Sequence, residues 1–418
     1  MKKVVASGMI GNGLEWYDYA LYGQMAWLLS KLFFPEGDET ATLLATYAVF
    51  AVGFVIRPLG AVLFGWIGDR YGRKHAMVIA VLMMAVPTGC IGLLPTYAEI
   101  GIWAPVMLVI IRLLQGLSLG GEFSGSITYI VEHAPAHKRA WAGSASLASL
   151  ALGFLLGSVV VKGSIALLGL EAFEAWGWRI PFLAGIAIGI VGYYIRRHCE
   201  ESPIYEEAKS KDELCKTPVR EAFRQHPWAM LQSFAIYITV TLPFYLTAIY
   251  FISFSSKQLG ASTEVAFEFH IYNMLVMLVG FVFSAWLSDR IGRRKVMLFA
   301  AALMFVATPL IFSYFEAGAS MLTIGLAQVA FAAIFSIYAG PVPALLVEMF
   351  PTSVRFSGMA IAYNLSAAIF GGTAPMLCEW LINYTGENSS VGYYVMAGNV
   401  VSLIALYYYR DRFREPLR

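Results

Sequence analysis

Two short charged signatures each occur twice in this chain, about half its length apart and in the same order. Asp69-Arg70-Tyr71-Gly72-Arg73-Lys74 returns as Asp289-Arg290-Ile291-Gly292-Arg293-Arg294, and Glu132-x-x-Pro135-x-x-x-Arg139 returns as Glu348-x-x-Pro351-x-x-x-Arg355. The offsets are 220 residues (69 to 289) and 216 residues (132 to 348). Two pairs with nearly the same offset indicate an internal duplication. Because long apolar runs separate the copies, we expect a two-fold membrane bundle.

The composition supports a membrane protein. Hydrophobic residues make up 59% and charged residues 13%, against roughly 45–50% and about 25% in soluble proteins. Several apolar runs exceed the ~20 residues that cross a bilayer. We therefore expect a lipid bilayer as the surroundings, and a net charge of +2 gives no reason to expect a nucleic-acid partner.

Twelve helical spans fit the hydrophobic pattern, which predicts an all-α integral membrane protein. They cover residues 10–34, 41–67, 76–95, 103–131, 141–166, 178–197, 227–254, 265–288, 296–315, 320–347, 356–382 and 391–409. The chain then divides into an N-terminal six-helix bundle (1–197), a cytoplasmic linker (198–226) and a C-terminal six-helix bundle (227–418).

The positive charges predict the orientation of the bundle. Of the 29 Lys and Arg residues, 23 fall on ends and loops that share a side with the N-terminus. The positive-inside rule then places both termini in the cytoplasm. We expect a multi-pass protein of the bacterial cytoplasmic (inner) membrane that acts as a monomer.

Ionisable groups inside the spans are candidates for function, because each costs at least ~2.5–3.5 kcal/mol to insert. Glu15 and Asp18 lie on one face of the first span, and Arg112 and Glu122 lie in the fourth. Asp18 is the expected counter-ion of Arg112, and its protonation would release the guanidinium. The alternative is a permanent ion pair that only fixes helix packing.

The remaining charged residues in or near the spans are predicted to have structural roles. Arg57 reads as a packing or snorkelling residue. Glu268 and Glu379 are expected at the membrane interface, and His270 as a hydrogen-bonded side chain. His133 and His137 lie four residues apart in a turn, but neither they nor the four cysteines have metal-site spacing, so we expect no metal and no cofactor.

Aromatic and amide side chains are plentiful enough to line a cavity. Prolines Pro243, Pro341 and Pro343 mark spans seven and ten as its walls, since a broken helix needs protein or water around it. Further cavity candidates are Tyr19, Tyr237, Phe244, Phe331, Phe335 and Tyr363. The expected substrate-binding residues are Arg112, Trp16, Tyr17, Tyr22, Tyr245, Tyr272, Asn273, Tyr338 and Asn364.

The duplicated turns predict a cytoplasmic latch between helix ends. An Asp there can cap the positive N-terminus of a neighbouring helix, and an Arg four residues on can pair with Glu132 or Glu348. The alternative is that the turns are topology signals alone. The acids at fixed spacing argue against it, because orientation depends little on Asp and Glu. The predicted latch comprises Asp69, Arg73, Glu132, Arg139, Asp289, Arg293, Glu348 and Arg355.

These signatures resemble the major facilitator superfamily over the whole chain, and within it the metabolite:H⁺ symporter family. The residues that carry the resemblance are Gly65-x-x-x-Asp69-Arg70-x-Gly72-Arg73-Lys74, Gly11-Asn12-x-x-Glu15-Trp16-Tyr17-Asp18, Arg57-Pro58-Leu59-Gly60, Arg112-Leu113-Leu114-Gln115-Gly116-x-x-x-Gly120-Gly121-Glu122, Trp176-Gly177-Trp178-Arg179-Ile180-Pro181-Phe182 and Glu201-Ser202-Pro203. The resemblance implies two six-helix halves, alternating access and proton-driven uptake of a small polar metabolite. It also implies that Asp18 and Arg112 couple the proton.

The intramembrane cations narrow the expected substrate. No span of the second half contains Lys or Arg. A zwitterion needs one cation for its carboxylate and an aromatic face for its ammonium group, which favours an amino acid or a betaine-type osmolyte such as proline or glycine betaine. The alternative is an organic acid such as 2-oxoglutarate, citrate or shikimate.

Other functions fit less well. Gly153-x-x-x-Gly157 is followed by Ser158, without the proline that drug/H⁺ antiporters of this superfamily carry. A membrane sensor or receptor would need an output domain, and an enzyme would need a catalytic constellation; the sequence shows neither. We therefore expect a proton-coupled importer whose partners are H⁺ and a small molecule.

Overall fold

The computed structural model describes residues 9, 12–13, 16–18, 20–35, 37–71, 73–197, 218–315, 319–351 and 354–417. The side chains at 65–77, 121, 122, 124, 125, 129, 188, 195, 196, 218, 219 and 356 lie outside the description. Within these ranges the elements are helices, and the structure gives no strand there. Nine of the described helices, or ten with one bent pair, are long and apolar enough to cross a membrane.

Helical segments of the first half follow the expected spans. They are α2 (Ala26–Phe33), α3 (Glu39–Val55), α4 (Arg57–Tyr71), α5 (Arg73–Leu93), α6 (Tyr97–Ile100), α7 (Trp103–Glu132), η1 (Ala136–Lys138), α8 (Arg139–Leu168), α9 (Leu170–Ala172), η2 (Phe173–Gly177) and α10 (Arg179–Arg197). The short turns between them keep neighbouring spans antiparallel.

The second half begins after residues 198–217, which lie outside the description and include most of the predicted linker. Its elements are α12 (Pro218–Gln225), α13 (Pro227–Tyr245), η3 (Leu246–Tyr250), α14 (Phe251–Lys257), α15 (Thr263–Ile291), α16 (Arg293–Ser313), α17 (Met321–Ala339), α18 (Val342–Met349), α19 (Arg355–Ser366), η4 (Ala367–Gly371), α20 (Ala374–Thr385) and α21 (Ser389–Tyr407).

Prolines break two spans at mid-depth, as expected from the sequence. Pro243 lies inside α13, just before the π-helical turn η3. Pro341 separates α17 from α18. Because proline removes one backbone donor and crowds the preceding turn, these helices bend where they meet the centre of the molecule.

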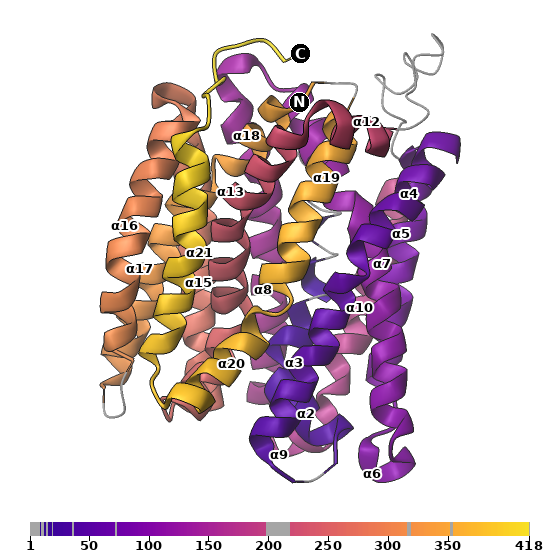
Figure 1. Cartoon of the computed structure of the whole chain (residues 1–418). Coiled ribbons are helices and arrows are strands. Elements are labelled where there is room, and N and C mark those ends of the chain that lie inside the picture. Colours follow the sequence, from indigo (N-terminus) through magenta and orange to yellow (C-terminus); the bar gives the residue numbers. More distant parts are fainter. Residues whose placement is uncertain are drawn as a thin grey trace.

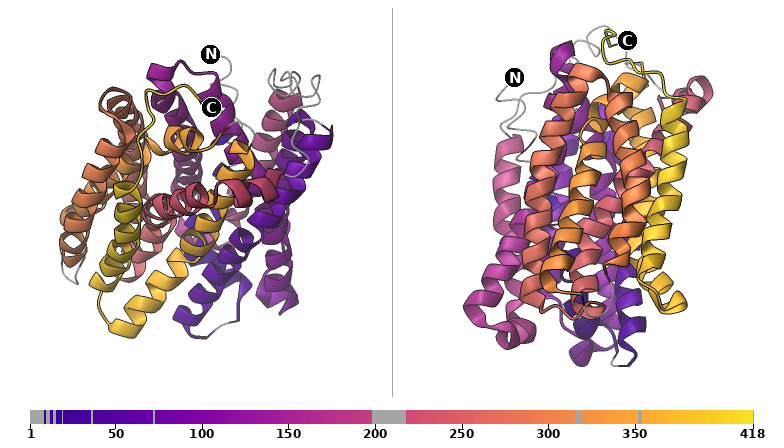
Figure 2. Two further views of the ribbon diagram at one scale, coloured as in Figure 1. Left: turned by 45° about the horizontal axis from the view of Figure 1, so that its top comes forward. Right: turned by 90° about the vertical axis from the view of Figure 1, so that its left-hand side faces the viewer.

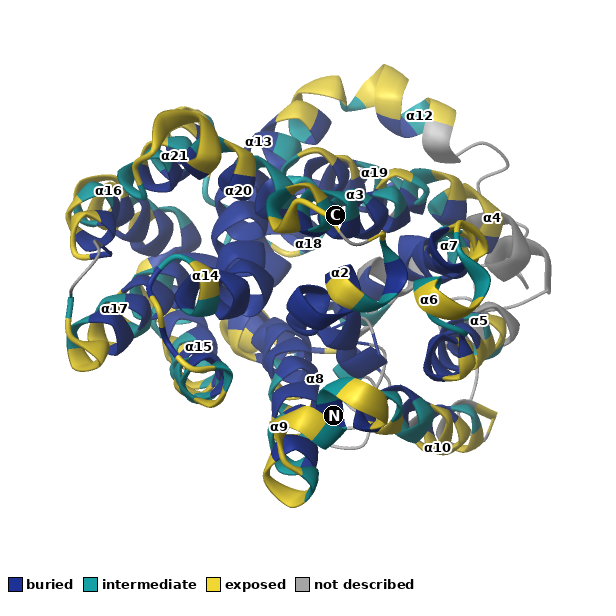
Figure 3. Cartoon of the chain, turned by 90° about the horizontal axis from the view of Figure 1, so that it is seen from below, coloured by how far each residue is buried: buried dark blue, intermediate teal, exposed yellow. Residues whose placement is uncertain are grey.

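The two halves stand side by side, the first in indigo to magenta and the second in red to yellow (Figure 1). They meet along α8 and α15, which pack against each other, and along α3 and α20. The span formed by α13, η3 and α14 is buried throughout its most apolar stretch, whereas that of α16 is 44% buried. Figure 2 shows the same bundle from two other sides, and Figure 3 shows buried residues at the centre with exposed ones around the rim.

Close packing of α7 against α3 and α4 depends on glycine. A Cβ atom at Gly116 would lie 2.0 Å from the carbonyl oxygen of Gly53, and one at Gly120 would lie 2.3 Å from that of Arg57. Small residues let membrane helices approach this closely. The contact brings Arg57 and Arg112 into the same part of the first half.

For the sites below, the tail end of the bundle is the end where residues 410–417 lie. The far end is the opposite one, where α20 ends at Thr385 and α15 begins at Thr263.

Candidate functional site

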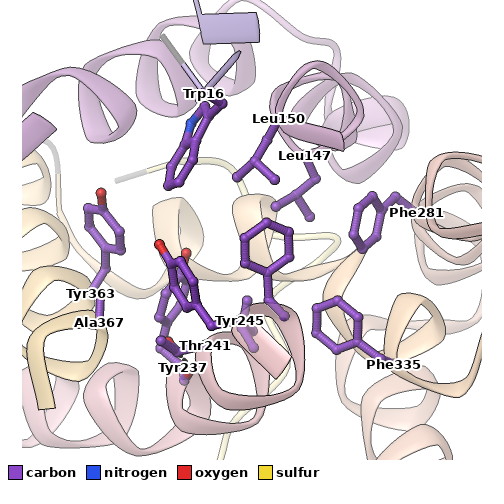
Figure 4. A pocket seen from close by; sticks show the side chains of 12 residues that line it. Trp16, Leu147, Leu150, Tyr237, Thr241, Tyr245, Phe281, Phe335, Tyr363 and Ala367 are labelled. Atoms are coloured by element: carbon purple, nitrogen blue, oxygen red, sulfur yellow. Dashed lines mark hydrogen bonds between the residues drawn. The ribbon is translucent and has the colours of Figure 1, made fainter. Parts of the chain in front are cut away.

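A central cavity lies where the two halves meet. Trp16, Leu147 and Leu150 come from the first half, and the remaining lining residues come from the second (Figure 4). The cavity is lined by Trp16, Leu147, Leu150, Tyr237, Val240, Thr241, Phe244, Tyr245, Phe281, Phe335, Tyr363 and Ala367. A small molecule held here would contact both halves at once.

Aromatic rings dominate the cavity wall. The ring of Phe244 lies 5.1 Å from that of Tyr245 and 6.3 Å from that of Trp16, and Tyr237 lies 5.2 Å from Tyr363. None of the twelve lining residues is an acid or a base. Such a wall suits a small ligand with apolar or cationic groups, because ring faces attract cations.

Arg57 lies at the edge of this cavity. Its guanidinium carbon is 3.9 Å from the ring centroid of Phe54 and 5.7 Å from that of Trp16, which lines the cavity. The residue is 0% exposed, so of the two expected roles, packing and snorkelling, the structure favours packing. The guanidinium is held instead on aromatic faces near the centre of the bundle.

Arg112 lies deeper in the first half. Its Nη1 donates to Oε1 of Gln115 at 2.7 Å, and its guanidinium carbon is 4.6 Å from the ring of Tyr22. Gln115 in turn donates to Oγ1 of Thr88 at 2.6 Å. A hydrogen-bonded chain therefore leads from Arg112 toward α5.

Asp18 is buried at the other end of that chain. A Cβ atom at Gly185 would lie 2.8 Å from Oδ1 of Asp18 and 3.0 Å from Cγ2 of Thr88. Asp18 and Arg112 thus lie in one buried neighbourhood, while their direct ion pair stays a prediction. Glu15 and the side chain of Glu122 lie outside the described residues.

At the tail end, three residues of the second half form a buried cluster. Arg293 pairs with Asp289 at 2.7 Å and with Glu348 at 3.0 Å. Arg139 from the start of α8 lies 3.8 Å from the same Glu348 oxygen. The cluster therefore joins α15, α16 and α18 to the first half.

Two further contacts cross between the halves at the tail end. Asp289 accepts hydrogen bonds from the backbone N–H groups of Ala140 at 3.1 Å and Trp141 at 2.9 Å. Arg355 pairs with Glu132 at 2.6 Å. The structure thus brings together six of the eight predicted latch residues; the side chains of the other two, Asp69 and Arg73, lie outside the description.

The far end also carries contacts between the halves. Nε2 of Gln24 lies 3.1 Å from Nε2 of His270, which is a buried hydrogen-bonded residue as expected. Lys162 of α8 pairs with Glu268 of α15 at 2.5 Å. Contacts between the halves therefore lie at both ends of the bundle.

Comparison with known proteins decides the family. The model of the family described as sugar (and other) transporter matches residues 4–221 and 204–411. A proline/betaine transporter of Salmonella typhimurium is 34% identical over 429 residues, which cover 100% of this chain and 85% of the relative. The chain belongs to the sugar (and other) transporter family.

A second relative of this transporter is the glycine betaine/proline/ectoine/pipecolic acid transporter OusA of Dickeya dadantii, 34% identical over 100% of this chain and 85% of its own. Among solved structures, the xylose transporter XylE from E. coli matches with a TM-score of 0.78 at 20% identity, over 99% of both chains. A further XylE structure, described as a major facilitator superfamily protein, has a TM-score of 0.78 at 21% identity, over 98% and 96% of the chains. These likenesses confirm the fold and the class: a multi-pass membrane transporter of the major facilitator superfamily.

In this transporter, two of the predicted substrate-binding residues line the cavity, namely Trp16 and Tyr245. Tyr17 instead donates to the carbonyl of Pro181 at 2.9 Å, and Tyr22 donates to that of Thr46 at 3.1 Å. Both tyrosines therefore join helices within the first half. Their hydroxyl groups are used for packing in this state.

The second-half residues of the predicted set are also mostly used in hydrogen bonds. Tyr338 donates to the carbonyl of Ile236 at 2.8 Å, and Asn273 donates to Gln328 at 3.2 Å. Asn364 donates to the carbonyl of Gly120 at 2.9 Å, across the two halves. Asn364 is thus an interface residue near, but outside, the cavity lining.

The prediction that Tyr272 binds the substrate requires a correction. It is 54% exposed, on the side of α15 that faces away from the cavity, so we withdraw it from the substrate-binding set. An apolar helix gives no periodic signal for its inner face, and the neighbouring Asn273 suggested the wrong one. Asn273 itself is fully buried.

The sequence predicted some of the residues that line the cavity but not others. Of the aromatic candidates, Tyr237, Phe244, Phe335 and Tyr363 line it. The ring of Phe331 packs beside Phe251 and Phe312 instead, and Tyr19 lies outside the described residues. Leu147, Leu150 and Phe281 were missed, because a leucine or phenylalanine on α8 or α15 looks the same whether it faces lipid, helix or cavity. Closeness in sequence to Pro243 was the available signal, because five of the lining residues fall between 237 and 245.

Proposed function

We propose that this transporter imports a small zwitterion together with one or more protons by alternating access. The substrate class is an amino acid or a betaine-type osmolyte such as proline or glycine betaine. The observation that carries the proposal is the aromatic cavity between the halves, with a buried guanidinium at its edge. Rings of Trp16, Tyr237 and Tyr245 would receive the ammonium group, at about 0.5–2 kcal/mol for each contact.

The carboxylate of the substrate would lie toward Arg57. Its guanidinium carbon lies 5.7 Å from the ring of Trp16, which lines the cavity. A planar guanidinium binds a carboxylate with two hydrogen bonds, which fixes the orientation of the ligand. The names of the two relatives, one for proline and betaine and one that adds ectoine and pipecolic acid, support this substrate class.

Proton coupling is assigned to Asp18 and Arg112. An acid and a guanidinium in one dry neighbourhood can exchange an ion pair for a protonated acid, and the released guanidinium can then alter helix packing. The tail-end cluster would hold the cytoplasmic ends closed while the far end opens. We assign the tail end to the cytoplasm, because most Lys and Arg residues fall on that side. The proposed location is the bacterial cytoplasmic membrane, with both termini inside.

Each transporting unit is proposed to be one chain, since a single chain supplies both walls of the cavity. One proton moving through 100 mV supplies ~2.3 kcal/mol, which corresponds to roughly fifty-fold accumulation of a neutral zwitterion. The two halves, 1–197 and 227–418, would rock about the cavity as units.

A second candidate function is symport of an organic acid. Its support is the pair of fully buried arginines, Arg57 and Arg112, in one region of the first half. A dicarboxylate would need both. The absence of charged residues from the twelve lining positions favours the zwitterion.

The test is uptake by purified protein in liposomes, with labelled proline, glycine betaine, 2-oxoglutarate and citrate. Each substrate is measured with and without an inward proton gradient. We expect concentrative uptake of proline or glycine betaine only with the gradient. Uptake that ignores the gradient would remove the symport proposal, and a preference for 2-oxoglutarate or citrate would replace the zwitterion by the organic acid.

A further inference from the structure

Glu379 on α20 is a buried acid of the second half. We expected it at the membrane interface, but it is 2% exposed, so that expectation is wrong. Helix α20 packs against η3 and against α3 of the first half. The carboxyl group therefore lies in the far-end third of the bundle, beside the boundary between the halves.

The contacts of this carboxyl group suit a neutral acid. Oε2 of Glu379 accepts a hydrogen bond from the hydroxyl of Tyr250 at 3.0 Å. Among the described residues, Glu379 forms no ion pair; Lys257, in the nearest basic position, lies 4.0 Å from Glu39. The side chain of Asn383 is a second neutral partner. An ionised carboxylate held in an apolar interior by neutral hydrogen-bond partners alone is costly, and adding a proton removes that cost.

Few other titratable groups face Glu379. On η3 and α3 these are tyrosine hydroxyls, and on α14 a single amine near the far-end surface. The groups with an electrostatic effect on Glu379, or affected by it, are Tyr47, Tyr250, Lys257 and Cys378. Tyr394 of α21 lies beyond Cys378, and η4, which also packs against α20, carries no titratable side chain. Among the described residues, Lys257 is therefore the basic group that acts on Glu379, and it pairs with Glu39 rather than with Glu379.

The site is linked to closure of the far end by two tyrosines. The ring of Tyr47, on α3 of the first half, lies 6.2 Å edge-on from the ring of Tyr250, and both residues are fully buried. Separating α3 from α20 and η3 would remove this cover and admit water to Glu379. Water solvates the ionised form, so opening favours loss of the proton and closing favours its uptake.

We propose that Glu379 is a proton-binding site of the second half, which binds H⁺ as the far end closes and releases it as the far end opens. The proton comes from the aqueous side of the far end, and the carboxylate becomes a neutral carboxylic acid. This rests on the proposed proton-coupled transport, but it adds a site that Asp18 and Arg112 do not provide. Proton chemistry then belongs to both halves of the molecule.

The direct test is infrared difference spectroscopy of the purified protein during a pH titration. A buried protonated acid gives a carboxylic C=O band that a carboxylate lacks. We expect Glu379→Gln to remove one component of this band. Glu387→Gln is the matched control, because Glu387 is an exposed far-end acid, and it should leave the band intact. An unchanged band in Glu379→Gln overturns the proposal.

Transport provides the second readout, in liposomes with the far end outward. Glu379→Gln mimics the protonated acid, so we expect uptake to depend less on outside pH, with the remaining dependence due to Asp18, while substrate exchange persists. Glu379→Asp should restore the dependence. Unchanged pH dependence in Glu379→Gln overturns the proposal. A loss of pH dependence that Glu379→Asp does not restore also overturns it, when glycine betaine still binds to both variants. If wild-type uptake does not depend on the proton gradient at all, the proposed symport fails. The infrared band then still tests whether Glu379 binds a proton.

Discussion

Each duplicated Glu lies opposite the Arg of the other copy. Glu132, from the first signature, pairs with Arg355 of the second at 2.6 Å, and Glu348, from the second signature, lies 3.8 Å from Arg139 of the first. The duplication therefore supplies both partners of a reciprocal contact across the tail end. A topology signal needs no such exchange, which favours the latch interpretation.

The Glu132–Arg355 pair should contribute measurably to stability. The side chain of Arg355 is 2% exposed and that of Glu132 is 14% exposed, so Arg355→Gln leaves a mostly buried acid without this partner. We expect a loss of about 2–3 kcal/mol, slightly below the ~3–5 kcal/mol of fully buried pairs. Equilibrium unfolding in mixed micelles measures it, with the double variant Glu132→Gln/Arg355→Gln to isolate the coupling.

Arg410→Gln is the control for this measurement. Arg410 pairs with Glu415 at 3.1 Å, but its side chain is 76% exposed, so water screens the pair. Removing it should not change stability measurably. Equal losses for Arg355→Gln and Arg410→Gln would contradict a specific role for the contact between the halves.

Trp16 should contribute to binding of a quaternary ammonium group. Trp16→Ala removes a ring face that lines the cavity, and we expect glycine betaine to bind about 2- to 30-fold more weakly. Trp16→Phe should have a smaller effect, since phenylalanine keeps a weaker ring face. Scintillation proximity binding gives the affinities. Trp380, 49% exposed and stacked on Tyr384, is the control: Trp380→Ala should bind as wild type.

Arg57 should recognise the carboxylate of the ligand. A hydrogen bond to a charged group contributes about 1.5–3 kcal/mol, so Arg57→Gln should weaken glycine betaine binding by about 10- to 150-fold. Choline, which has the same ammonium group and no carboxylate, should bind equally to both proteins. Arg290→Gln is the control, as Arg290 lies over the ring of Trp286 at the tail end. A parallel loss for both ligands would indicate a packing role instead.

Asp18 should be required for accumulation and dispensable for exchange. Asp18→Asn cannot carry a proton, so substrate should equilibrate across the membrane without concentrating. Counterflow with preloaded liposomes separates the two activities. Asp38→Asn is matched to it, because Asp38 is an exposed N-cap whose side chain accepts from the N–H of Thr40, and Asn caps equally well. Wild-type accumulation by Asp18→Asn would exclude the coupling role.

Much of the fold was predictable because length and apolarity are decisive in a bilayer. A run of about twenty apolar residues must close its own backbone hydrogen bonds, so helix is the outcome for the runs that became α7, α8 and α15. Polar turns fix where those helices end: Glu132 ends α7 and Arg139 begins α8, as the signature implied. The duplication then determined that a second set of ends would lie at equivalent places.

The sequence by itself therefore determined the spans, their order, the two-fold plan and the charged ends. Tertiary structure alone decided which face of each span looks inward. Tyr272 and Tyr245 are alike in sequence terms, yet the first is 54% exposed and the second lines the cavity. Glu379, expected at the interface, is likewise buried. The physical reason is that lipid and protein interior are both apolar, so hydrophobicity marks a span without marking its inner side.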